Sequence, residues 1–383
     1  MKFIIYLLVF CLSPAVLCAQ QANKPDDALL LDYYQNQRFK EAADYLKTIY
    51  AEPVVSTKAL AQLAYTANMA GRLAEAESYY QRIYDADSTN TAVLYSLGSL
   101  NLRRGNALKA ESFYKRIIAR DTTNFLVYKQ LAGISSDKND IASMVVYLQR
   151  ANKLNPAEPD VASDLSDLYV SMKFNSQAEK VLNAAILADP ENIVLLNSLL
   201  KLVYAQKKWP EAVEAGIKLV KSGNNSGQVL TKLGAAYYNL KNYECSVAAF
   251  ADISDMAQNE TSYYYAALAY KALKDNRMAI EKMYKAITEG VSPNVASYYA
   301  EIADSNEKLA SFKKAALAYQ KSLQFDDKNP MIYYSMASLY DTELKDKKSA
   351  VKYYKKYISL KPPVEKQKGY IDYSKSRIAM LSR

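Results

Sequence analysis

The sequence predicts an all-α solenoid of about ten helix-turn-helix repeats of 34 residues each, followed by one closing helix. Three observations point to this fold class. Residues of one type recur at a fixed spacing, prolines fall between the expected helices, and no segment shows the period-two alternation of a strand. Because each repeat in such an array packs only against its neighbours, an imperfect repeat weakens the array locally without disrupting it.

A small residue recurs every 34 positions through the first seven repeats and at similar intervals in the last three. A leucine lies thirteen residues before each of the first seven, and the residue after that leucine is usually Gly, Ala or Ser. Small residues let two helices approach closely, so the pattern predicts tight packing within each repeat. The recurring positions are Ala42, Ala76, Ala110, Met144, Ala178, Ala212, Ser246, Ala279, Ala315 and Ala350, and the leucines are Leu29, Leu63, Leu97, Leu131, Leu165, Leu199 and Leu233.

Every proline from Pro25 onward falls where a helix is expected to begin or where two repeats join. Proline is tolerated in the first turn of a helix but breaks a helix interior, because it lacks the backbone N–H. The proline positions therefore mark the boundaries of the expected helices. They are Pro25, Pro53, Pro156, Pro159, Pro190, Pro210, Pro293, Pro330, Pro362 and Pro363.

The repeat resembles the tetratricopeptide repeat, whose signature is Leu-Gly/Ala in the first helix and Ala in the second. The third repeat matches clearly, with Leu97-Gly98 followed by Ala110 and Tyr114. The resemblance covers residues 23–363 and implies a right-handed superhelical solenoid; it departs from the pattern at Met144, at Gly216 and by one extra residue within 341–348. The expected repeats start near residues 23, 57, 91, 125, 159, 193, 227, 260, 296 and 330.

The C-terminal end is basic and is expected to close the array. Residues 364–383 form an amphipathic segment that we predict to be a capping helix over the last repeat. Residues 341–383 hold 12 Lys or Arg against 5 Asp or Glu. This end is either a solvated terminus or a basic surface for an anionic envelope surface or an acidic protein, and no nucleic-acid partner is expected. The candidate basic residues are Lys352, Lys355 and Lys356.

The N-terminal 19 residues have the pattern of a signal peptide, with Lys2, an apolar run from Phe3 to Leu12 and a short stretch closing at Ala19. The apolar stretch is shorter than the ~20 residues that a spanning helix needs. We therefore predict export to the periplasm with cleavage after Ala19. An uncleaved signal acting as an anchor and lipid attachment at Cys18 stay as alternatives.

The composition excludes much catalytic chemistry. The chain has no His, the commonest general base and zinc ligand, and its ten glycines form no phosphate-binding loop. Cys245, the one cysteine left after cleavage, is expected to fill the core of a second helix, and Trp209 is expected to pack where another second helix begins. We predict that the protein is not an enzyme and that it uses no cofactor or metal.

The family resemblance implies a concave groove that binds extended peptides, lined by the second, fifth, ninth, twelfth and thirteenth positions of each first helix. Here these positions are rich in tyrosine and amides, which suits peptides or glycans, although tyrosine is abundant throughout, with 34 in all. A clamp for C-terminal carboxylates is not expected, because Gly133 follows Lys129 where the clamp needs Asn. The groove candidates are Tyr65, Asn68, Tyr95, Lys129, Asn197, Lys201, Tyr204, Tyr238, Asn239, Tyr264 and Tyr334.

Repeat five carries an acidic candidate patch. Asp160, Asp164 and Asp167 share one helix face by their spacing, and Asp137 is expected nearby from the repeat before. The patch would receive a cationic segment or a divalent ion; the alternative is a solvated face, with Asp160 favoured by the helix dipole.

Two inter-repeat turns, 87–89 and 121–123, read Asp-Ser-Thr and Asp-Thr-Thr. They resemble a short O-glycosylation motif of exported proteins in some Bacteroidetes, while the same residues are also favoured in turns and helix caps. The combined features predict a non-enzymatic protein-interaction scaffold of the cell envelope, of Bacteroidetes-like origin, that holds partner segments in its groove. The alternative is a glycan- or peptidoglycan-associated binding module.

Overall fold

The computed structural model describes residues 24–290 and 293–382, so the predicted signal peptide lies outside the described residues. Within them the fold is all-α, as predicted, with no strand. The chain divides into two compact units, and the boundary in the sequence falls between Leu154 and Asn155. No helix among the described residues has both the length and the apolar content needed to cross a bilayer.

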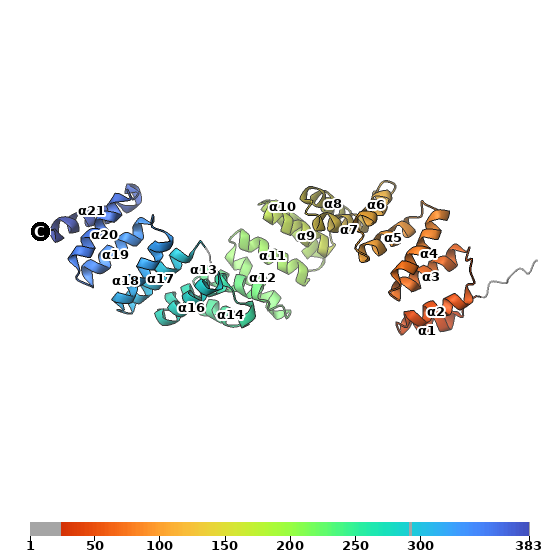
Figure 1. The fold of residues 1–383 in the computed structure, drawn as a ribbon, viewed down its shortest axis with the longest axis horizontal. Coiled ribbons are helices and arrows are strands. Elements are labelled where there is room, and N and C mark those ends of the chain that lie inside the picture. Colours follow the sequence, from red (N-terminus) through yellow and green to blue (C-terminus); the bar gives the residue numbers. More distant parts are fainter. Residues whose placement is uncertain (1–23, 291–292, 383) are drawn as a thin grey trace, which may run out of the picture. The chain divides into compact units, whose positions relative to one another are not determined.

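The first unit is a row of helical hairpins in chain order (Figure 1). Consecutive helices pair within each hairpin, and each hairpin packs on the next. Its helices are α1 (Asp27–Gln35), α2 (Phe39–Ile49), α3 (Thr57–Met69), α4 (Leu73–Ala86), α5 (Thr91–Arg103), α6 (Ala107–Ile118), α7 (Phe125–Asp137) and α8 (Ile141–Leu154).

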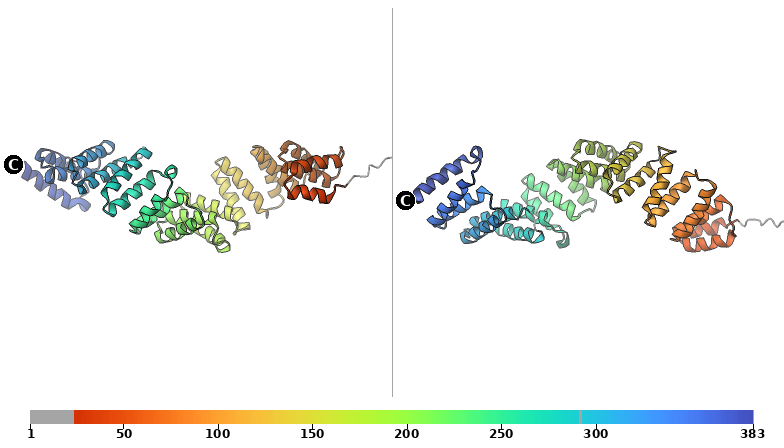
Figure 2. Two further views of the ribbon diagram at one scale, coloured as in Figure 1. Left: turned by 90° about the horizontal axis from the view of Figure 1, so that it is seen from below. Right: turned by 45° about the horizontal axis from the view of Figure 1, so that its top comes forward.

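The second unit continues in the same manner and ends on an unpaired helix; the succession of hairpins can be followed in two further views (Figure 2). Odd-numbered helices up to α19 are called A helices below, and even-numbered helices are called B helices. The second unit contains α9 (Pro159–Ser171), α10 (Asn175–Ala188), α11 (Ile193–Ala205), α12 (Trp209–Lys221), α13 (Gly227–Asn239), α14 (Tyr243–Ala251), the 3-10 turn η1 (Asp255–Ala257), α15 (Glu260–Ala272), α16 (Asn276–Glu289), α17 (Val295–Lys308), α18 (Phe312–Phe325), α19 (Pro330–Thr342), α20 (Lys347–Ser359) and α21 (Val364–Leu381).

Local chemistry explains where the helices begin and end. Asn90, Asn124 and Asn192 precede A helices, and their side chains accept hydrogen bonds from backbone N–H groups of the first turn. Each A–B turn contains one residue with a left-handed backbone, which ends the A helix. These residues are Gln37, Gly71, Gly105, Asn139, Lys173, Lys207, Lys241, Lys274, Ala310 and Lys345.

The recurring small residues form the contact between the two helices of each hairpin. Nine of the ten have at most 2% of their surface exposed, and only Met144, the departure noted in the sequence, is partly exposed. Gly98 shows the closeness of the packing, because a Cβ placed there would lie 2.7 Å from the Tyr114 ring. Leu29 is 37% exposed, so its expected core role is wrong; α1 has no earlier helix to cover it among the described residues, and Leu30 is buried instead.

Two hairpins depart from the regular repeat. The turn between α19 and α20 has four residues where the turn between α3 and α4 has three, which is the extra residue expected from the sequence. Helix α14 ends early at Ala251, and the chain then forms η1. A Cβ at Gly227 would lie 2.8 Å from that of Ala257, so η1 packs against the start of α13, and a glycine leaves the space for it.

The capping helix is confirmed, and a buried ion pair attaches it to the last repeat. Asp341 of α19 has a side chain that is 2% exposed, and Arg377 of α21 donates to both carboxylate oxygens at 2.6 Å. Tyr354 of α20 donates to the same carboxylate at 3.3 Å. This bidentate pairing lowers the pKa of Asp341 and keeps the buried group charged.

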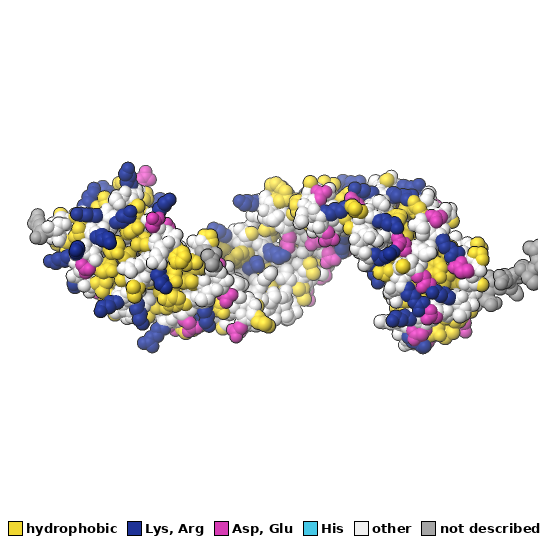
Figure 3. Space-filling view, in the orientation of Figure 1, with side chains coloured by type: hydrophobic (Ala, Val, Ile, Leu, Met, Phe, Trp, Pro, Cys, Tyr) yellow, Lys and Arg dark blue, Asp and Glu magenta, His cyan; other side chains and the backbone are white. Residues whose placement is uncertain are grey.

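Basic side chains are concentrated towards the end of the second unit. Figure 3 shows Lys and Arg side chains over the C-terminal hairpins, with hydrophobic atoms between them and few carboxylates. Helices α18 and α20 together contain eight lysines and no Asp or Glu. The excess charge expected from the sequence therefore lies mainly on B helices.

Candidate functional site

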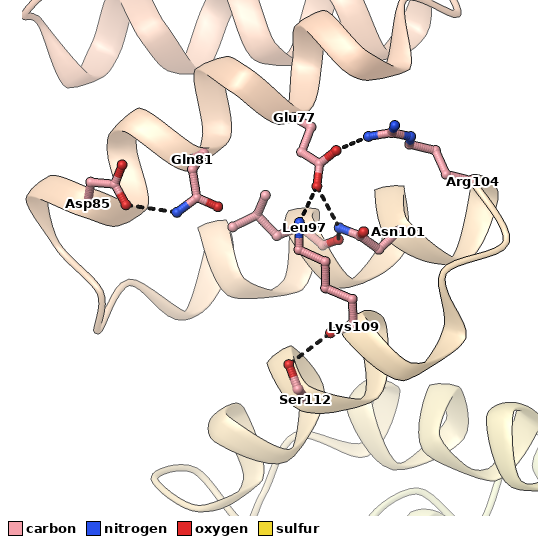
Figure 4. A network of polar contacts seen from close by, with 8 residues as sticks. All are labelled: Glu77, Gln81, Asp85, Leu97, Asn101, Arg104, Lys109 and Ser112. Atoms are coloured by element: carbon pink, nitrogen blue, oxygen red, sulfur yellow. Dashed lines mark hydrogen bonds and ion pairs between the residues drawn. The ribbon is translucent and has the colours of Figure 1, made fainter.

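Charged contacts between repeats follow a regular pattern that serves assembly. Figure 4 shows the carboxylate of Glu77 in α4, which pairs with Arg104 and Lys109 of the following hairpin and accepts a hydrogen bond from the amide of Asn101. The same relation recurs one repeat later, where Lys138 pairs with Glu111. These partly exposed pairs each contribute about 0–1 kcal/mol and mainly set the register of adjacent hairpins. They are not candidates for binding a partner.

The surface that A helices present in the second unit, called the helix-A face below, brings together side chains from successive repeats. Helices α9, α11, α13 and α15 pack against one another in order. Ser163 of α9 and Ser198 of α11 share a buried hydrogen bond of 2.7 Å. Beside it, Lys201 of α11 pairs with Asp167 of α9. Two of the predicted site residues, one from the groove set and one from the acidic set, are thus partners of each other.

Lys232 of α13 lies next to this ion pair and was not predicted from the sequence. It is partly buried, and among the described residues no carboxylate lies within ion-pair distance of its amine. Burial lowers the pKa of Lys232, repulsion from Lys201 lowers it further, and Asp167 acts in the opposite direction. A cation that is desolvated without its own counter-ion favours the arrival of a carboxylate.

Tyrosines from successive A helices continue this surface. Tyr264 of α15 and Tyr298 of α17 have ring centroids 5.0 Å apart, and Tyr238 of α13 lies 5.6 Å from Tyr265. Burial, assisted by the neighbouring Tyr265, raises the pKa of Tyr204 to about 12. The Tyr204 hydroxyl is therefore neutral at ordinary pH and can act as a hydrogen-bond donor or acceptor.

Two of these tyrosines also have a structural role. Tyr204 packs edge-on against Trp209 at 5.5 Å, and Tyr238 packs on Tyr243 at 5.7 Å. In both pairs an aromatic residue late in an A helix meets the first residue of the next B helix. The expectation that Trp209 packs is confirmed, and the packing accounts for part of the tyrosine abundance.

An ion cluster bounds the tyrosines at α17. Lys271 of α15 pairs with Glu301 and Asp304 of α17, each at 2.5 Å, and Lys308 pairs with Asp304 at 2.9 Å. Burial opposes the charge on Lys271, yet its hydrogen bonds to the two carboxylates leave the pKa raised. The cluster was also missed at the sequence level, because each of its members is unremarkable on its own helix.

Other groove candidates have intramolecular partners. Arg103 donates to the Asn68 side chain at 2.6 Å, and Asn224 donates to Asn197 at 3.3 Å. Tyr65 packs on Tyr34 at 5.9 Å, Tyr95 packs on Tyr114 at 5.6 Å, and Asn239 donates to its own helix at 2.8 Å. Lys129 is partly buried on α7. Their predicted role in binding a partner stays a prediction.

Tyr334 does not lie in an open groove. Its ring lies 4.7 Å from Tyr370 and 6.5 Å from Tyr373, both in the capping helix, and 5.5 Å from Tyr357. Assigning it to the groove by its repeat position was wrong, because α21 covers this end of the last A helix. Tyr334 belongs to the interface that holds the cap.

The acidic patch is not one cluster. Asp167 is neutralised by Lys201, while Asp160 and Asp164 are exposed and interact within the chain. Asp137 belongs to the other unit. Across residues 24–290 and 293–382, no three Asp, Glu or Cys side chains are grouped closely enough to hold a metal ion. The divalent-ion hypothesis for Asp160, Asp164 and Asp167 therefore has no geometric support.

The lone cysteine and the two turn motifs are also placed by the structure. Cys245 is exposed in the first turn of α14, so the core-filling interpretation was wrong, and its neighbour Ser246 is the buried residue. Thr89 and Thr123 each bond to the carboxylate two residues earlier, Asp87 and Asp121, through both backbone N–H and hydroxyl. These contacts are those of ordinary turns, with the threonines exposed.

Comparison with known proteins agrees with this fold. A tetratricopeptide repeat family model matches residues 28–91, and a second matches residues 332–363. The chain therefore contains tetratricopeptide repeats (TPR) in both of its units. The matched segments are α1 to α4 and the last hairpin, α19 with α20.

Individual relatives of this TPR protein are distant. A TPR repeat-containing protein of Methanocaldococcus jannaschii is 27% identical over 135 residues, which is 35% of this chain and 22% of that protein. A TPR protein structure from Parabacteroides merdae has 14% identity and a TM-score of 0.44 over 65% of this chain and 98% of its own. MamA from Desulfovibrio magneticus has 17% identity and a TM-score of 0.40 over 44% and 94%.

TPR proteins generally mediate protein–protein interactions, and the repeat is typically a non-enzymatic scaffold. Within that class, the predicted tyrosines and Lys201 meet residues that the sequence did not single out, namely Lys232, Lys271, Glu301 and Asp304. The sequence did not reveal these residues, because they come together only through the packing of adjacent A helices, which the sequence of one helix does not show.

Proposed function

We propose that this TPR protein is a scaffold that holds a segment of a protein partner against the helix-A face from α9 to α15. The observation that carries the proposal is Lys232, a partly buried cation without an ion-pair partner among the described residues. A carboxylate of the partner would receive its charge. A charge-assisted hydrogen bond in such a place is worth about 1.5–3 kcal/mol.

The surroundings of Lys232 support a peptide ligand. Asn239 donates through Nδ2 to its own helix, which leaves its side-chain oxygen to accept from a peptide N–H, and Tyr264 offers a rigid ring with a hydroxyl. Lys201 is a second cation near Lys232, but its charge is already paired with Asp167. The arrangement contains one cation to fix a carboxylate and several groups that tolerate varied sequence, which suits a scaffold with a short acidic recognition segment.

The test is crosslinking in cells from a photoreactive residue placed at Asn239, which is exposed at the end of α13. The control position is Leu187, which is 86% exposed on the B helix α10. We expect a protein adduct from position 239 whose yield falls about tenfold or more in Lys232→Met, and no fall in the matched variant Lys180→Met. Retention of polysaccharide in place of protein would favour the glycan-binding alternative and reject the scaffold.

The same proposal places the protein in the periplasm after removal of residues 1–19. An intact mass of the mature protein tests this: we expect a chain that starts at Gln20 and carries no lipid. A mass that includes Cys18 with a diacylglycerol group would show an anchored lipoprotein instead, and a mass that includes Met1 would show an uncleaved signal.

A further inference from the structure

The B helices of the last three repeats carry a second surface, which is separate from the helix-A face. Two hollows lie side by side on it, one of about 710 Å³ between α16 and α18 and one of about 650 Å³ between α18 and α20. Helix α18 forms a wall of both. We call this surface, made of α16, α18 and α20 with the two hollows, the helix-B face.

Charge is segregated between the two faces at this end of the chain. Helix α18 has three lysines and α20 has five, and neither has an acidic residue. The carboxylates of the intervening A helices are already engaged. On α17, Glu301 and Asp304 both pair with Lys271, and Glu307 accepts a hydrogen bond from Tyr319 at 2.6 Å. On α19, Asp341 pairs with Arg377 of the capping helix. On α16, Glu281 pairs with Lys282 and Lys285, and among the described residues no carboxylate forms an ion pair with a lysine of α18 or α20.

Aromatic rings place the lysine ammonium groups at the rims. Lys356 lies 5.8 Å over the Tyr333 ring and Lys352 lies 5.4 Å over the Tyr353 ring, both at the α18–α20 hollow. Lys321 lies 5.3 Å over Tyr299 at the other hollow. Within the described part of the chain none of these three lysines has an ion pair, so each ammonium group is available to an anion.

Apolar side chains take part in the lining of each hollow. In the α16–α18 hollow, Leu317 is 61% exposed and Leu309 is 37% exposed, and Ile280 also lines it together with polar groups. In the α18–α20 hollow the apolar lining includes Leu323 and the Tyr353 ring. Aliphatic side chains next to lysines match a ligand that has apolar side chains between carboxylates. A polysaccharide would leave the aliphatic side chains unused, and a flat membrane would not fill concave hollows.

We propose that the helix-B face of α16, α18 and α20 docks an acidic segment of a protein partner, with its apolar side chains in the two hollows and its carboxylates on the lysines at the rims. This proposal goes beyond the scaffold function of the helix-A face and uses none of its residues. It gives the protein two separate binding surfaces, so one copy can hold two partners at once.

The test uses short fluorescein-labelled synthetic peptides and fluorescence anisotropy at low and at physiological ionic strength. One peptide has leucines at helical spacing with Glu at the remaining positions; a second has Lys in place of Glu, and a third has Ser in place of Leu. We expect the Glu/Leu peptide to bind at least about tenfold more tightly than either of the others, with an affinity that falls as salt rises.

Charge reversal on the protein gives the matched comparison. The triple variant Lys314→Glu, Lys352→Glu and Lys356→Glu should weaken binding of the Glu/Leu peptide about tenfold or more and flatten its salt dependence. The control triple variant reverses Lys153, Lys180 and Lys221, which are exposed on the B helices α8, α10 and α12. It makes the same change in net charge and should leave binding unchanged.

A single substitution tests the apolar lining. Leu317→Ser should weaken binding of the Glu/Leu peptide severalfold, whereas Leu187→Ser, at a more exposed leucine of α10, should not. Acetylation of lysines in the unmodified protein, followed by mass spectrometry, supplies a readout that does not depend on folding of a variant. The peptide should protect Lys314, Lys352 and Lys356 from acetylation.

The proposal is overturned if the two triple variants bind equally well, or if the peptide protects no lysine of α18 or α20. It is also overturned if the Lys/Leu or the Ser-containing peptide binds as tightly as the Glu/Leu peptide. If phosphatidylglycerol vesicles or alginate bind in a charge-reversal-sensitive way while the Glu/Leu peptide does not, the occupant is a membrane or a glycan and the protein segment is rejected.

Discussion

A methyl group added at Gly98 measures how much the fold depends on close approach of the two helices in a hairpin. The Cβ of Gly98→Ala would lie 2.7 Å from one atom of the Tyr114 ring and 2.8 Å from the next, against about 3.5–4.0 Å for ordinary carbon contacts. Tyr114 is completely buried, so its ring has no solvent-filled space to enter. Either the ring or helix α5 must shift by roughly 1 Å, and overpacking of this kind costs about 1–3 kcal/mol.

An alanine also gains about 0.5–1 kcal/mol over glycine inside a helix, which offsets part of this cost. Gly133 in α7 allows the two effects to be separated, because a Cβ there meets no atom within 4 Å. Gly133→Ala should therefore be stabilising by the helix propensity alone. The difference between the two variants isolates the packing cost of about 1–3 kcal/mol, and Gly98→Ala by itself should be destabilising by about 1 kcal/mol.

Native-state hydrogen exchange is the suitable assay, since a repeat array need not unfold in two states. We expect exchange in α5 and α6 to be about five- to tenfold faster in Gly98→Ala, and exchange in α7 to be slower in Gly133→Ala. Gly234→Ala is an independent repetition in the second unit, where the Cβ would lie 2.7 Å from Phe250. Slower exchange in α5 for Gly98→Ala would refute the reasoning, because it would mean that Tyr114 moves aside at no cost.

Three further predictions concern a turn and two titrating groups. Lys207 has a φ of 58°, so Lys207→Gly should stabilise the α11–α12 hairpin by about 1 kcal/mol, measured as slower exchange there; no change would show that the turn is unstrained. The pKa of Asp341 is lowered in the folded state, so its stabilisation is present above its unfolded pKa near 3.9 and is lost as pH falls through the lower folded value. Hydrogen exchange in α21 should therefore accelerate in acid. Arg377→Ala should release α21 already at neutral pH. Equal protection of α21 in Arg377→Ala and in the unmodified protein would contradict the role given to the ion pair. The pKa of Tyr204 is raised to about 12, so the neutral hydroxyl favours the fold and stability should fall between pH 10 and 12; Tyr204→Phe should lose part of this alkaline dependence in denaturant titrations, and an unchanged profile would refute it.

The interior of the array was predictable from sequence to a large extent, and its surface was not. Ala110 and Tyr114 lie four residues apart on one helix and face Leu97 and Gly98 on its partner, so the composition of each contact follows from spacing within a single repeat. Cys245 was misplaced because it adjoins the buried Ser246 at the start of a helix, where a rotation of one residue exchanges the core for solvent. Tyr334 was misplaced because the helix that covers it comes from outside the repeat pattern.

The sequence by itself determined the all-α class, the period of the repeats, the helix boundaries marked by Pro, and the presence of a capping helix. These properties depend on residues close together in the chain, which is why a periodic pattern contains them. Only the tertiary structure decided that Lys201 is neutralised by Asp167 while Lys232 beside them is not, and that the lysines of α18 and α20 surround apolar hollows. Charge compensation and the shape of a surface depend on side chains one repeat or more apart, whose distances are set by how neighbouring hairpins stack.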